Sequence, residues 1–183
     1  MKKEEIQKAL SSEIMPEPKR TGNAKLAAVL VVIHGQEPTI IMTERPKTMT
    51  LHAGEISFPG GTWKQNDDDL LTTALRETRE EISLGISRDQ VIGQLKPVTT
   101  LNSGFTITPF IAITPKITNL VPNHEIEEIL NIPLFSLLKT MTHDPDPTHQ
   151  SIQEMYTFTY QDKLIWGASA RILKQMASLL LEK

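Results

Sequence analysis

The amino-acid sequence predicts a fold of the α/β (α+β) class, an α/β/α sandwich with a mixed central β-sheet. Three observations lead to this prediction. Short apolar segments rich in β-branched residues occur on both sides of the middle of the chain, one strongly helical segment separates them, and an amphipathic segment closes the chain. This order of elements is typical of a mixed sheet enclosed between helices.

The length and composition of the chain limit what kind of protein it is. A chain of 183 residues is long enough for one domain with its own hydrophobic core. Within this chain we distinguish an N-terminal segment from the domain itself. Residues 1–23 contain a short amphipathic helix over 3–12 and a lead-in with proline and glycine, and residues 24–183 form a single domain.

Charge and hydropathy exclude several classes of function. A formal net charge of -3, no long basic run and only two Trp, two Tyr and five Phe argue against a nucleic-acid partner. The longest apolar stretch, 26–33, is far shorter than the roughly 20 residues of a membrane-spanning helix. The N-terminus has no apolar segment of the kind found in secretory signals, so we expect a cytoplasmic protein with no membrane partner.

The first half of the domain begins with two predicted strands. The run LAAVLVVI at 26–33 predicts a buried strand, and PTIIMTER at 38–45 predicts its hairpin partner. The segment LHAGEISFPGG at 51–61 contains Pro59 directly before two glycines, so we expect no regular element to run through it.

A helix is predicted in the middle of the chain. The segment LLTTALRETREEISL at 70–84 has helical periodicity, and Gly85 is expected to end it. Its N-cap is expected among the three preceding residues, Asp67, Asp68 and Asp69.

The second half is predicted to add strands and a final helix. VIGQLKPVTT and FTITPFIAIT are interpreted as strands that Pro97 and Pro109 interrupt. EIEEIL and PLFSLL are interpreted as short helices, and MYTFTY and KLIW as a hairpin. ASARILKQMASLLLEK predicts an amphipathic helix, and Trp166 just before it is expected to be a core residue.

Three glutamates mark the predicted central helix as a candidate site. At 100° per residue, Glu77, Glu80 and Glu81 fall within an arc of about 100°, away from the apolar face. Like charges at these spacings destabilise an isolated helix unless they are compensated. One reading is a solvated acidic face, and the other is a divalent-cation site. Because the chain has no cysteine, oxygen ligands for Mg²⁺ or Mn²⁺ are favoured.

The glycine-rich loop and the acidic helix together resemble the signature of the Nudix hydrolases, G-x5-E-x7-R-E-U-x-E-E-x-G-U. The matching residues are Gly61, Asp68, the run Arg76–Glu81 and Leu84. Three departures are present, because Asp68 replaces the first glutamate, Ser83 replaces the later glycine, and one extra residue follows Gly61.

Within this family the chain most resembles the coenzyme A pyrophosphatases. Their second signature, L-L-T-x-R-[SA]-x3-R-x3-G-x3-F-P-G-G, matches at Thr43, Arg45, Gly54 and Phe58-Pro59-Gly60-Gly61, and departs at Pro46 and Thr50. The segments SGFTITPF, PNHEIEEILNIPL and IWGASARIL are also similar to segments of that branch. The resemblance covers roughly residues 24–180.

The resemblance implies an Mg²⁺-dependent (or Mn²⁺-dependent) hydrolase of a diphosphate in a small nucleotide substrate. Coenzyme A would give 4'-phosphopantetheine and adenosine 3',5'-bisphosphate, and acyl-coenzyme A the acylated arm. The implied metal ligands are Glu77, Glu80, Glu81 and the Gly61 carbonyl, and Arg76 would orient the glutamates in a network with Asp68. The general base would be one of these glutamates or Glu125. The implied substrate contacts are Arg45, His52, Phe58, Gly60 and Gly61.

Other functions stay open at this point. The substrate could instead be ADP-ribose, a dinucleotide or a nucleoside triphosphate, and the chain could be a catalytically silent binding module of the same fold. The three intact glutamates argue against the silent module. No EF-hand spacing is present, which argues against a calcium site of that type. A homodimer is also left open.

Overall fold

The central sheet is built around a long parallel pair of strands. In the computed structural model, which describes residues 2–18, 25–48, 53–100, 103–117, 119–144 and 155–182, β1 (Lys25–His34) pairs in parallel with all of β7 (Phe105–Thr114). The other strands of this eight-stranded sheet pair antiparallel, so the sheet is mixed, in the order β3-β2-β1-β7-β5, with β4 on β1, β6 on β7 and β8 on β2. These strands are β2 (Thr39–Glu44), β3 (Ile56–Ser57), β4 (Gly60–Thr62), β5 (Val91–Gln94), β6 (Val98–Thr99) and β8 (Glu128–Pro133).

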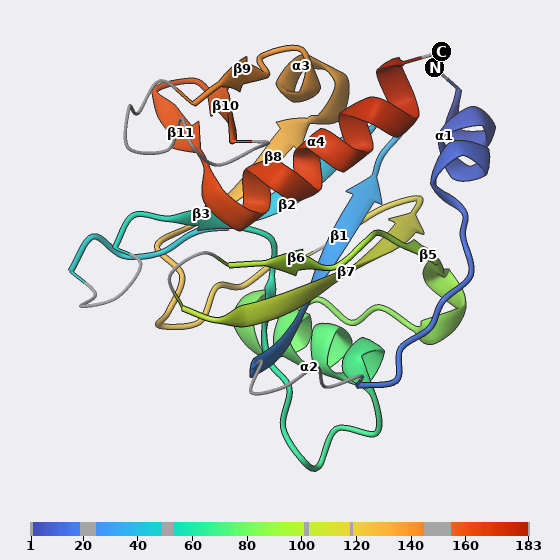
Figure 1. Ribbon diagram of the computed structural model, residues 1–183, viewed down its shortest axis with the longest axis vertical. Coiled ribbons are helices and arrows are strands. Elements are labelled where there is room, and N and C mark those ends of the chain that lie inside the picture. Colours follow the sequence, from blue (N-terminus) through green and yellow to red (C-terminus); the bar gives the residue numbers. More distant parts are fainter. Residues whose placement is uncertain are drawn as a thin grey trace.

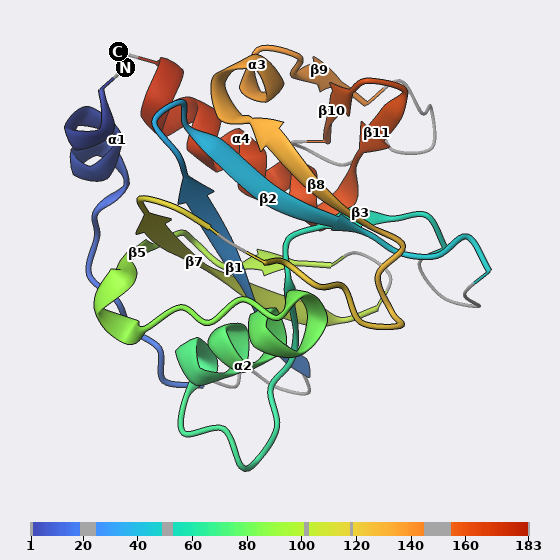
Figure 2. The ribbon, with the colours of Figure 1, turned by 180° about the vertical axis from the view of Figure 1, so that it is seen from behind.

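Helices cover both faces of the sheet, as predicted (Figures 1 and 2). Helix α2 (Leu70–Ile82) lies on one face, and α1 (Lys3–Leu10), α3 (Leu134–Leu138) and α4 (Gly167–Leu181) lie on the other. Alternation along β1 divides the core in two, because successive side chains of a strand point to opposite faces. Leu30 and Val32 belong to the cluster with α2, whereas Val31 and Ile33 belong to the cluster with α1, α3 and α4.

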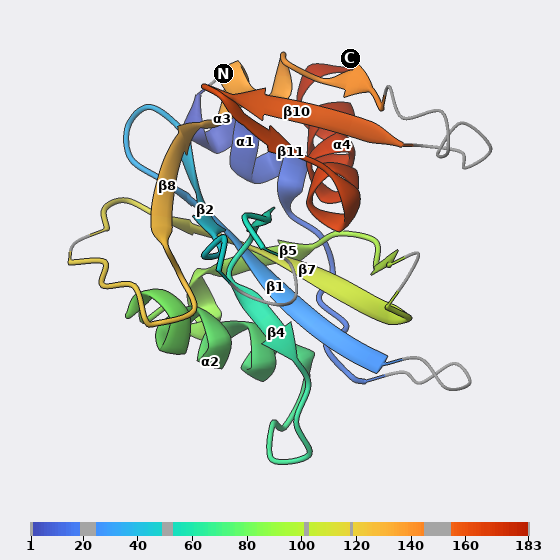
Figure 3. The same cartoon turned by 90° about the vertical axis from the view of Figure 1, so that its left-hand side faces the viewer.

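A smaller sheet lies on the α4 side of the molecule (Figure 3). It has the order β11-β10-β9, formed by β9 (Thr142–His143), β10 (Tyr156–Tyr160) and β11 (Lys163–Ile165). The predicted hairpin of MYTFTY and KLIW is therefore confirmed. A single 3₁₀ turn, η1 (Arg88–Gln90), precedes β5.

The central helix begins as predicted and ends earlier than predicted. Asp69 is the N-cap, and its side chain accepts a hydrogen bond of 2.7 Å from the Thr72 N–H. The helix ends at Ile82, because Ser83 adopts the left-handed conformation with φ 59° and donates its N–H to the Arg79 carbonyl. The prediction that Gly85 ends the helix was wrong.

Proline interrupts only one of the two later strands. Pro97 lies in the gap between β5 and β6, whereas β7 runs without a break through Pro109. The Pro109 carbonyl accepts a hydrogen bond of 2.9 Å from the Leu95 N–H, so the side of Pro109 that lacks a donor faces this same gap. A missing donor is tolerated there because no regular ladder position is lost.

Three other predictions are corrected by the structure. The segment EIEEIL is not helical, because its second half enters β8, where Leu130 and Ile132 are buried by antiparallel pairing with β2. The segment 51–61, where no regular element was expected, contributes β3 and β4 on either side of Pro59. Trp166 is 46% exposed and is not a core residue. None of the helices in the described part of the chain combines the length and apolar character that crossing a bilayer requires.

Candidate active site

The bend at Pro59 with the two glycines that follow it, which we call the Gly60–Gly61 turn, and the central helix form the base of the candidate site. Gly60 and Gly61 are held in β4 by antiparallel pairing with β1, opposite Val29 and Ala28. A Cβ on Gly60 would lie 2.3 Å from the Ala28 carbonyl oxygen, and a Cβ on Gly61 would lie 2.7 Å from the Glu77 carboxyl carbon. Only glycine therefore allows the turn to approach both the sheet and the acidic face of α2.

Glu81 lies at the centre of this arrangement. It is 5% exposed, in the last turn of α2, and its Oε2 accepts a hydrogen bond of 3.0 Å from the Gly60 N–H. The pKa of Glu81 is raised to about 7, mainly by burial and to a smaller extent by the negative charges of Glu77 and Glu125. The Gly60 N–H and the Arg45 guanidinium act in the opposite direction but do not cancel the effect of burial on this pKa.

Arg45 connects two carboxylates from different parts of the chain. Its Nη2 lies 3.8 Å from the Glu81 Oε1, and its Nη1 lies 3.4 Å from the Glu125 Oε2. The backbone of Arg45 is fixed just after β2, where its N–H donates to the Glu55 carbonyl and its carbonyl accepts from the Gly54 N–H. The predicted residues Arg45, Glu81 and Glu125 are therefore brought together.

The loop that carries Glu125 is attached to the end of α2. Asn123 donates its N–H to the Glu81 carbonyl at 2.8 Å, and Val121 donates to the Ile82 carbonyl at 3.1 Å. The Asn123 Oδ1 then accepts a hydrogen bond of 2.9 Å from the Glu125 N–H. These contacts hold Glu125 next to Glu81 despite their separation in sequence.

Arg76 forms a second network, with a partner that differs from the predicted one. Its Nε and Nη2 each donate a hydrogen bond of 2.8 Å to the Asp67 carboxylate, and its Nη1 contacts Glu77 at 2.6 Å and Glu80 at 3.1 Å. Hydrogen bonding from Arg76 lowers the pKa of Asp67 to about 2. Asp68, the predicted partner, is exposed. The network prediction is therefore corrected from Asp68 to Asp67.

The spacing after Gly61 explains this correction. Five residues separate Gly61 from Asp67, which is the G-x5-E spacing of the Nudix signature. The extra residue therefore lies between Asp67 and Arg76, and does not directly follow Gly61. Counting five residues from Gly61 would have identified Asp67. The buried Thr73, whose hydroxyl donates to Asp67 at 2.9 Å, has no counterpart in the sequence prediction.

The predicted metal ligands have suitable chemistry, although they are not arranged as a closed cluster. The side chains of Glu77 and Glu80 are 15% and 50% exposed and both contact Arg76. Within the described residues, no group of three or more His, Asp or Glu side chains is positioned to hold a metal ion. All the donors are oxygen, which fits a hard divalent cation, and the mutual repulsion of Glu77, Glu81 and Glu125 would be relieved by such a cation.

One predicted substrate contact, Phe58, lies in the core and not at the site. Phe58 is 2% exposed and packs in the core cluster shared with α4, because its side chain points away from the face that carries α2. Its role in the structure is packing, so its predicted contact with substrate is withdrawn. His52 lies outside the described residues, as does Thr50.

Comparison with known proteins defines the class to which this site belongs. A family model described as the NUDIX domain matches residues 24–156. The chain therefore belongs to the Nudix hydrolase family.

Curated relatives and solved structures agree with this assignment. A protein of Photorhabdus laumondii is 36% identical over 170 residues, which cover 90% of each chain. One of Yersinia enterocolitica is 34% identical over 161 residues, covering 86% of this chain and 82% of that protein. Both bear the name uncharacterized Nudix hydrolase NudL.

The solved structures share the fold at low sequence identity. A MutT/nudix family protein from Enterococcus faecalis has a TM-score of 0.60 at 14% identity, over 90% of this chain and 63% of that chain. A NUDIX hydrolase from Alicyclobacillus acidocaldarius has a TM-score of 0.56 at 18% identity, over 87% of this chain and 93% of that chain. These structural similarities establish the fold, and not the substrate.

Proposed function

We propose that this Nudix hydrolase cleaves the diphosphate of coenzyme A or acyl-coenzyme A with the help of Mg²⁺ or Mn²⁺. The products would be 4'-phosphopantetheine, or its acyl form, and adenosine 3',5'-bisphosphate. The observation that carries the proposal is that Arg45, Glu81 and Glu125 meet beside the Gly60–Gly61 turn.

The proposed cation site consists of Glu77, Glu80, Glu81 and the Gly61 carbonyl. A divalent cation bound there would neutralise charge on the phosphoryl oxygens and lower the pKa of the attacking water. Arg76 supports the site by contacting Glu77 and Glu80 while Asp67 holds its other edge. Arg76 is therefore proposed as a positioning residue.

Hydrolysis also requires a group that accepts a proton from the attacking water. The candidates are the three glutamates of α2 and Glu125. Glu81 and Glu125 contact the same guanidinium, that of Arg45, so either could face a water held at this point. Comparing Glu81→Gln with Glu125→Gln would separate the roles. Loss of the base lowers kcat, whereas loss of a metal ligand also raises the Mg²⁺ concentration needed for half-maximal activity.

The preference for coenzyme A depends on Arg45. Coenzyme A carries a 3'-phosphate that ADP-ribose and NADH lack, and an arginine can bind such a group through paired hydrogen bonds. The Arg45 side chain contacts Glu81 and is 24% exposed, so part of this side chain is accessible to a substrate. Thr50, which replaces the second arginine of the branch signature, leaves Arg45 as the matched cation for this role.

A product-release assay tests the proposal. Coenzyme A, acetyl-coenzyme A, ADP-ribose and NADH are each incubated with the full chain and Mg²⁺, Mn²⁺ or EDTA. We expect the two coenzyme A substrates to be hydrolysed fastest, and no hydrolysis in EDTA. Faster hydrolysis of ADP-ribose or NADH would refute the substrate and retain the Nudix reaction. No hydrolysis of any substrate with either cation would favour the silent binding module.

A further inference from the structure

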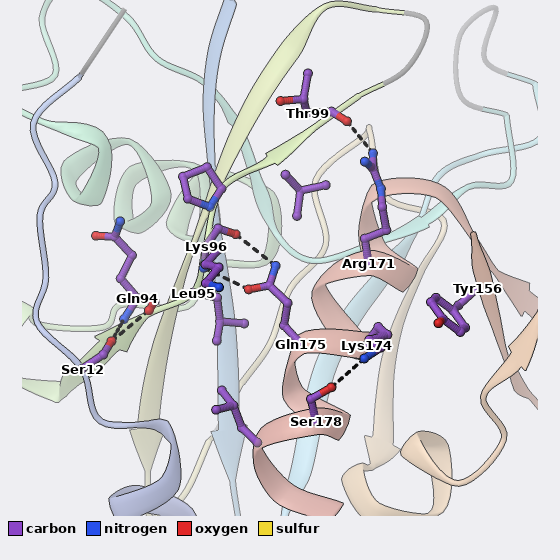
Figure 4. A pocket seen from close by; sticks show the side chains of 13 residues that line it. Ser12, Gln94, Leu95, Lys96, Thr99, Tyr156, Arg171, Lys174, Gln175 and Ser178 are labelled. Carbon is purple, nitrogen blue, oxygen red and sulfur yellow. Dashed lines mark hydrogen bonds between the residues drawn. The ribbon is translucent and has the colours of Figure 1, made fainter. Parts of the chain in front are cut away.

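A cavity lies on the face of the sheet opposite α2. It has a volume of about 700 Å³ and is lined by residues of α4 and of the connection between β5 and β6 (Figure 4). Because α2 and the Gly60–Gly61 turn pack on the other side of the sheet, this cavity is separate from the candidate active site. We call it the α4 groove.

The α4 groove combines an apolar floor with a cationic wall. Leu95 and Val98 are 6% and 5% exposed and form part of the floor. The wall carries Lys96, Arg171 and Lys174, and none of the described lining residues is acidic. The described lining is therefore cationic, although the formal net charge of the chain is -3.

Hydrogen bonds between α4 and the strands give the groove a fixed shape. The Gln175 side chain accepts from the Lys96 N–H and donates to the Lys96 carbonyl, each at 3.0 Å. The Arg171 Nη2 donates to the Thr99 carbonyl, which joins α4 to β6 as Figure 4 shows. The groove is therefore formed before any ligand arrives, and little ordering would be needed for binding.

Lys174 is held over the groove by weaker contacts. Its Nζ donates to the Ser178 hydroxyl at 2.8 Å and lies 5.9 Å from the centre of the Tyr156 ring. Its nearest carboxylate is Glu182 at 4.0 Å, whose side chain is 64% exposed. A surface ion pair of this length contributes little, so a ligand anion can compete for Lys174.

From these observations we propose that the α4 groove binds a small phosphate monoester with an apolar or aromatic body. Two or three positive side chains fit a ligand with a dianionic phosphate better than they fit a ligand with a singly charged carboxylate. The volume lies within the range of ligand sites of roughly 300–1,000 Å³, which have mostly apolar walls and few polar groups. The apolar body would lie over Leu95 and Val98, beside Tyr156.

Phenyl phosphate is a suitable probe, and NMR of the full ¹⁵N-labelled chain locates where it binds. We expect saturable shifts of the amide signals of 94–99 and 171–178. Inorganic phosphate lacks the apolar body and phenol lacks the charge, so each should bind at least about tenfold more weakly. Shifts confined to 60–62 and 76–81 would place the probe in the candidate active site and overturn the proposal.

Charge variants provide the second test. Lys96→Gln with Lys174→Gln should weaken phenyl phosphate binding by about tenfold or more, because two charge-assisted contacts are lost. Lys139→Gln, which removes an exposed lysine outside the groove, is the matched control and should leave the affinity unchanged. Arg171 is retained because it joins α4 to β6. Equal affinity of the double variant and the wild type, with both folded by circular dichroism, would overturn the proposal.

Discussion

Asp67 and Glu81 are both buried carboxylates beside an arginine, yet their pKa values shift in opposite directions. Asp67 accepts two hydrogen bonds of 2.8 Å from Arg76, and these lower its pKa to about 2. Glu81 lies 3.8 Å from Arg45, and its burial, which outweighs this contact, raises its pKa to about 7.

The difference separates a structural ion pair from a carboxylate, Glu81, that we propose to be reactive. A bidentate pair satisfies the buried charge of Asp67 and fixes Arg76 in one orientation. The charge of Glu81 is poorly compensated and is repelled by Glu77 and Glu125. Carboxylates with opposite environments in one site are typical of enzymes that assign them different roles.

The largest expected effect concerns Glu81. Glu81→Gln should lower Mg²⁺-dependent hydrolysis by at least about 100-fold, because a metal ligand or the proton acceptor is lost. Initial rates with coenzyme A measure the effect, and circular dichroism checks the fold. Glu4→Gln, on the exposed side of α1, is the control and should keep full activity. Full activity of Glu81→Gln would refute the assigned site.

The next effect concerns the ion pair of Asp67 and Arg76. Asp67→Asn should lower the free energy of unfolding by about 2–3 kcal/mol at pH 7, because the paired charge-assisted hydrogen bonds between Arg76 and the Asp67 carboxylate are lost. Asp68→Asn should change it by less than about 0.5 kcal/mol, since Asp68 is exposed. Urea unfolding of both variants measures the difference. Equal effects of the two substitutions would contradict the assignment of Asp67 to the network.

The pair of Asp67 and Arg76 also predicts how the free energy of unfolding changes at low pH. The folded-state pKa of Asp67, about 2, is below its ordinary value of 3.8, so its stabilisation is present above about pH 4 and is lost as the pH falls towards 2. The gap in unfolding free energy between wild type and Asp67→Asn should therefore narrow over this interval. A constant gap from pH 6 to pH 2.5 would show that the charge of Asp67 is not what stabilises the fold.

The raised pKa of Glu81 predicts that the free energy of unfolding depends on pH in the opposite direction. Because its folded-state pKa is raised from 4.5 to about 7, the folded state loses stability as the pH rises through this interval. Glu81→Gln should therefore stabilise the metal-free protein at pH 8 by on the order of 2 kcal/mol, and by much less at pH 4.5. Urea unfolding in EDTA at the two pH values measures this. A Glu81→Gln variant less stable than wild type at pH 8 would contradict the burial cost.

The smallest effect concerns substrate choice. Arg45→Gln should raise KM for coenzyme A about tenfold more than KM for ADP-ribose, because only coenzyme A offers a 3'-phosphate. Losing the contact between Arg45 and Glu81 should change kcat equally for both substrates. The ratio of KM for coenzyme A to KM for ADP-ribose therefore reports the contact with the 3'-phosphate. An equal rise for both substrates would place the 3'-phosphate elsewhere.

Local patterns in the sequence were enough to predict most of the fold. The apolar run at 26–33 and the periodicity of 70–84 identified β1 and α2, because these segments have strong local preferences. EIEEIL was misassigned because pairing with β2, far away in sequence, overrides its helical preference. The exposure of Trp166 could not be predicted either, since it depends on how the small sheet meets α4.

The candidate site was predictable where its residues are close in sequence. The spacing of Glu77, Glu80 and Glu81 on one helix face is a local property. The choice between Asp67 and Asp68 required the position of Arg76 relative to a loop. The contact of Glu125 with Arg45 depends on the hydrogen bond between Asn123 and the end of α2. No local sequence pattern predicts this bond.

The parallel pairing of β1 with β7 also determines when the site can assemble. Arg45, the Gly60–Gly61 turn and Glu81 all lie in the stretch of chain that this pairing closes into a loop. Closing a long loop costs entropy before its contacts form, so this step is expected to be slow in folding. During synthesis, the Gly60–Gly61 turn and α2 can pack on the completed β1–β7 pair only after Thr114 has left the ribosome.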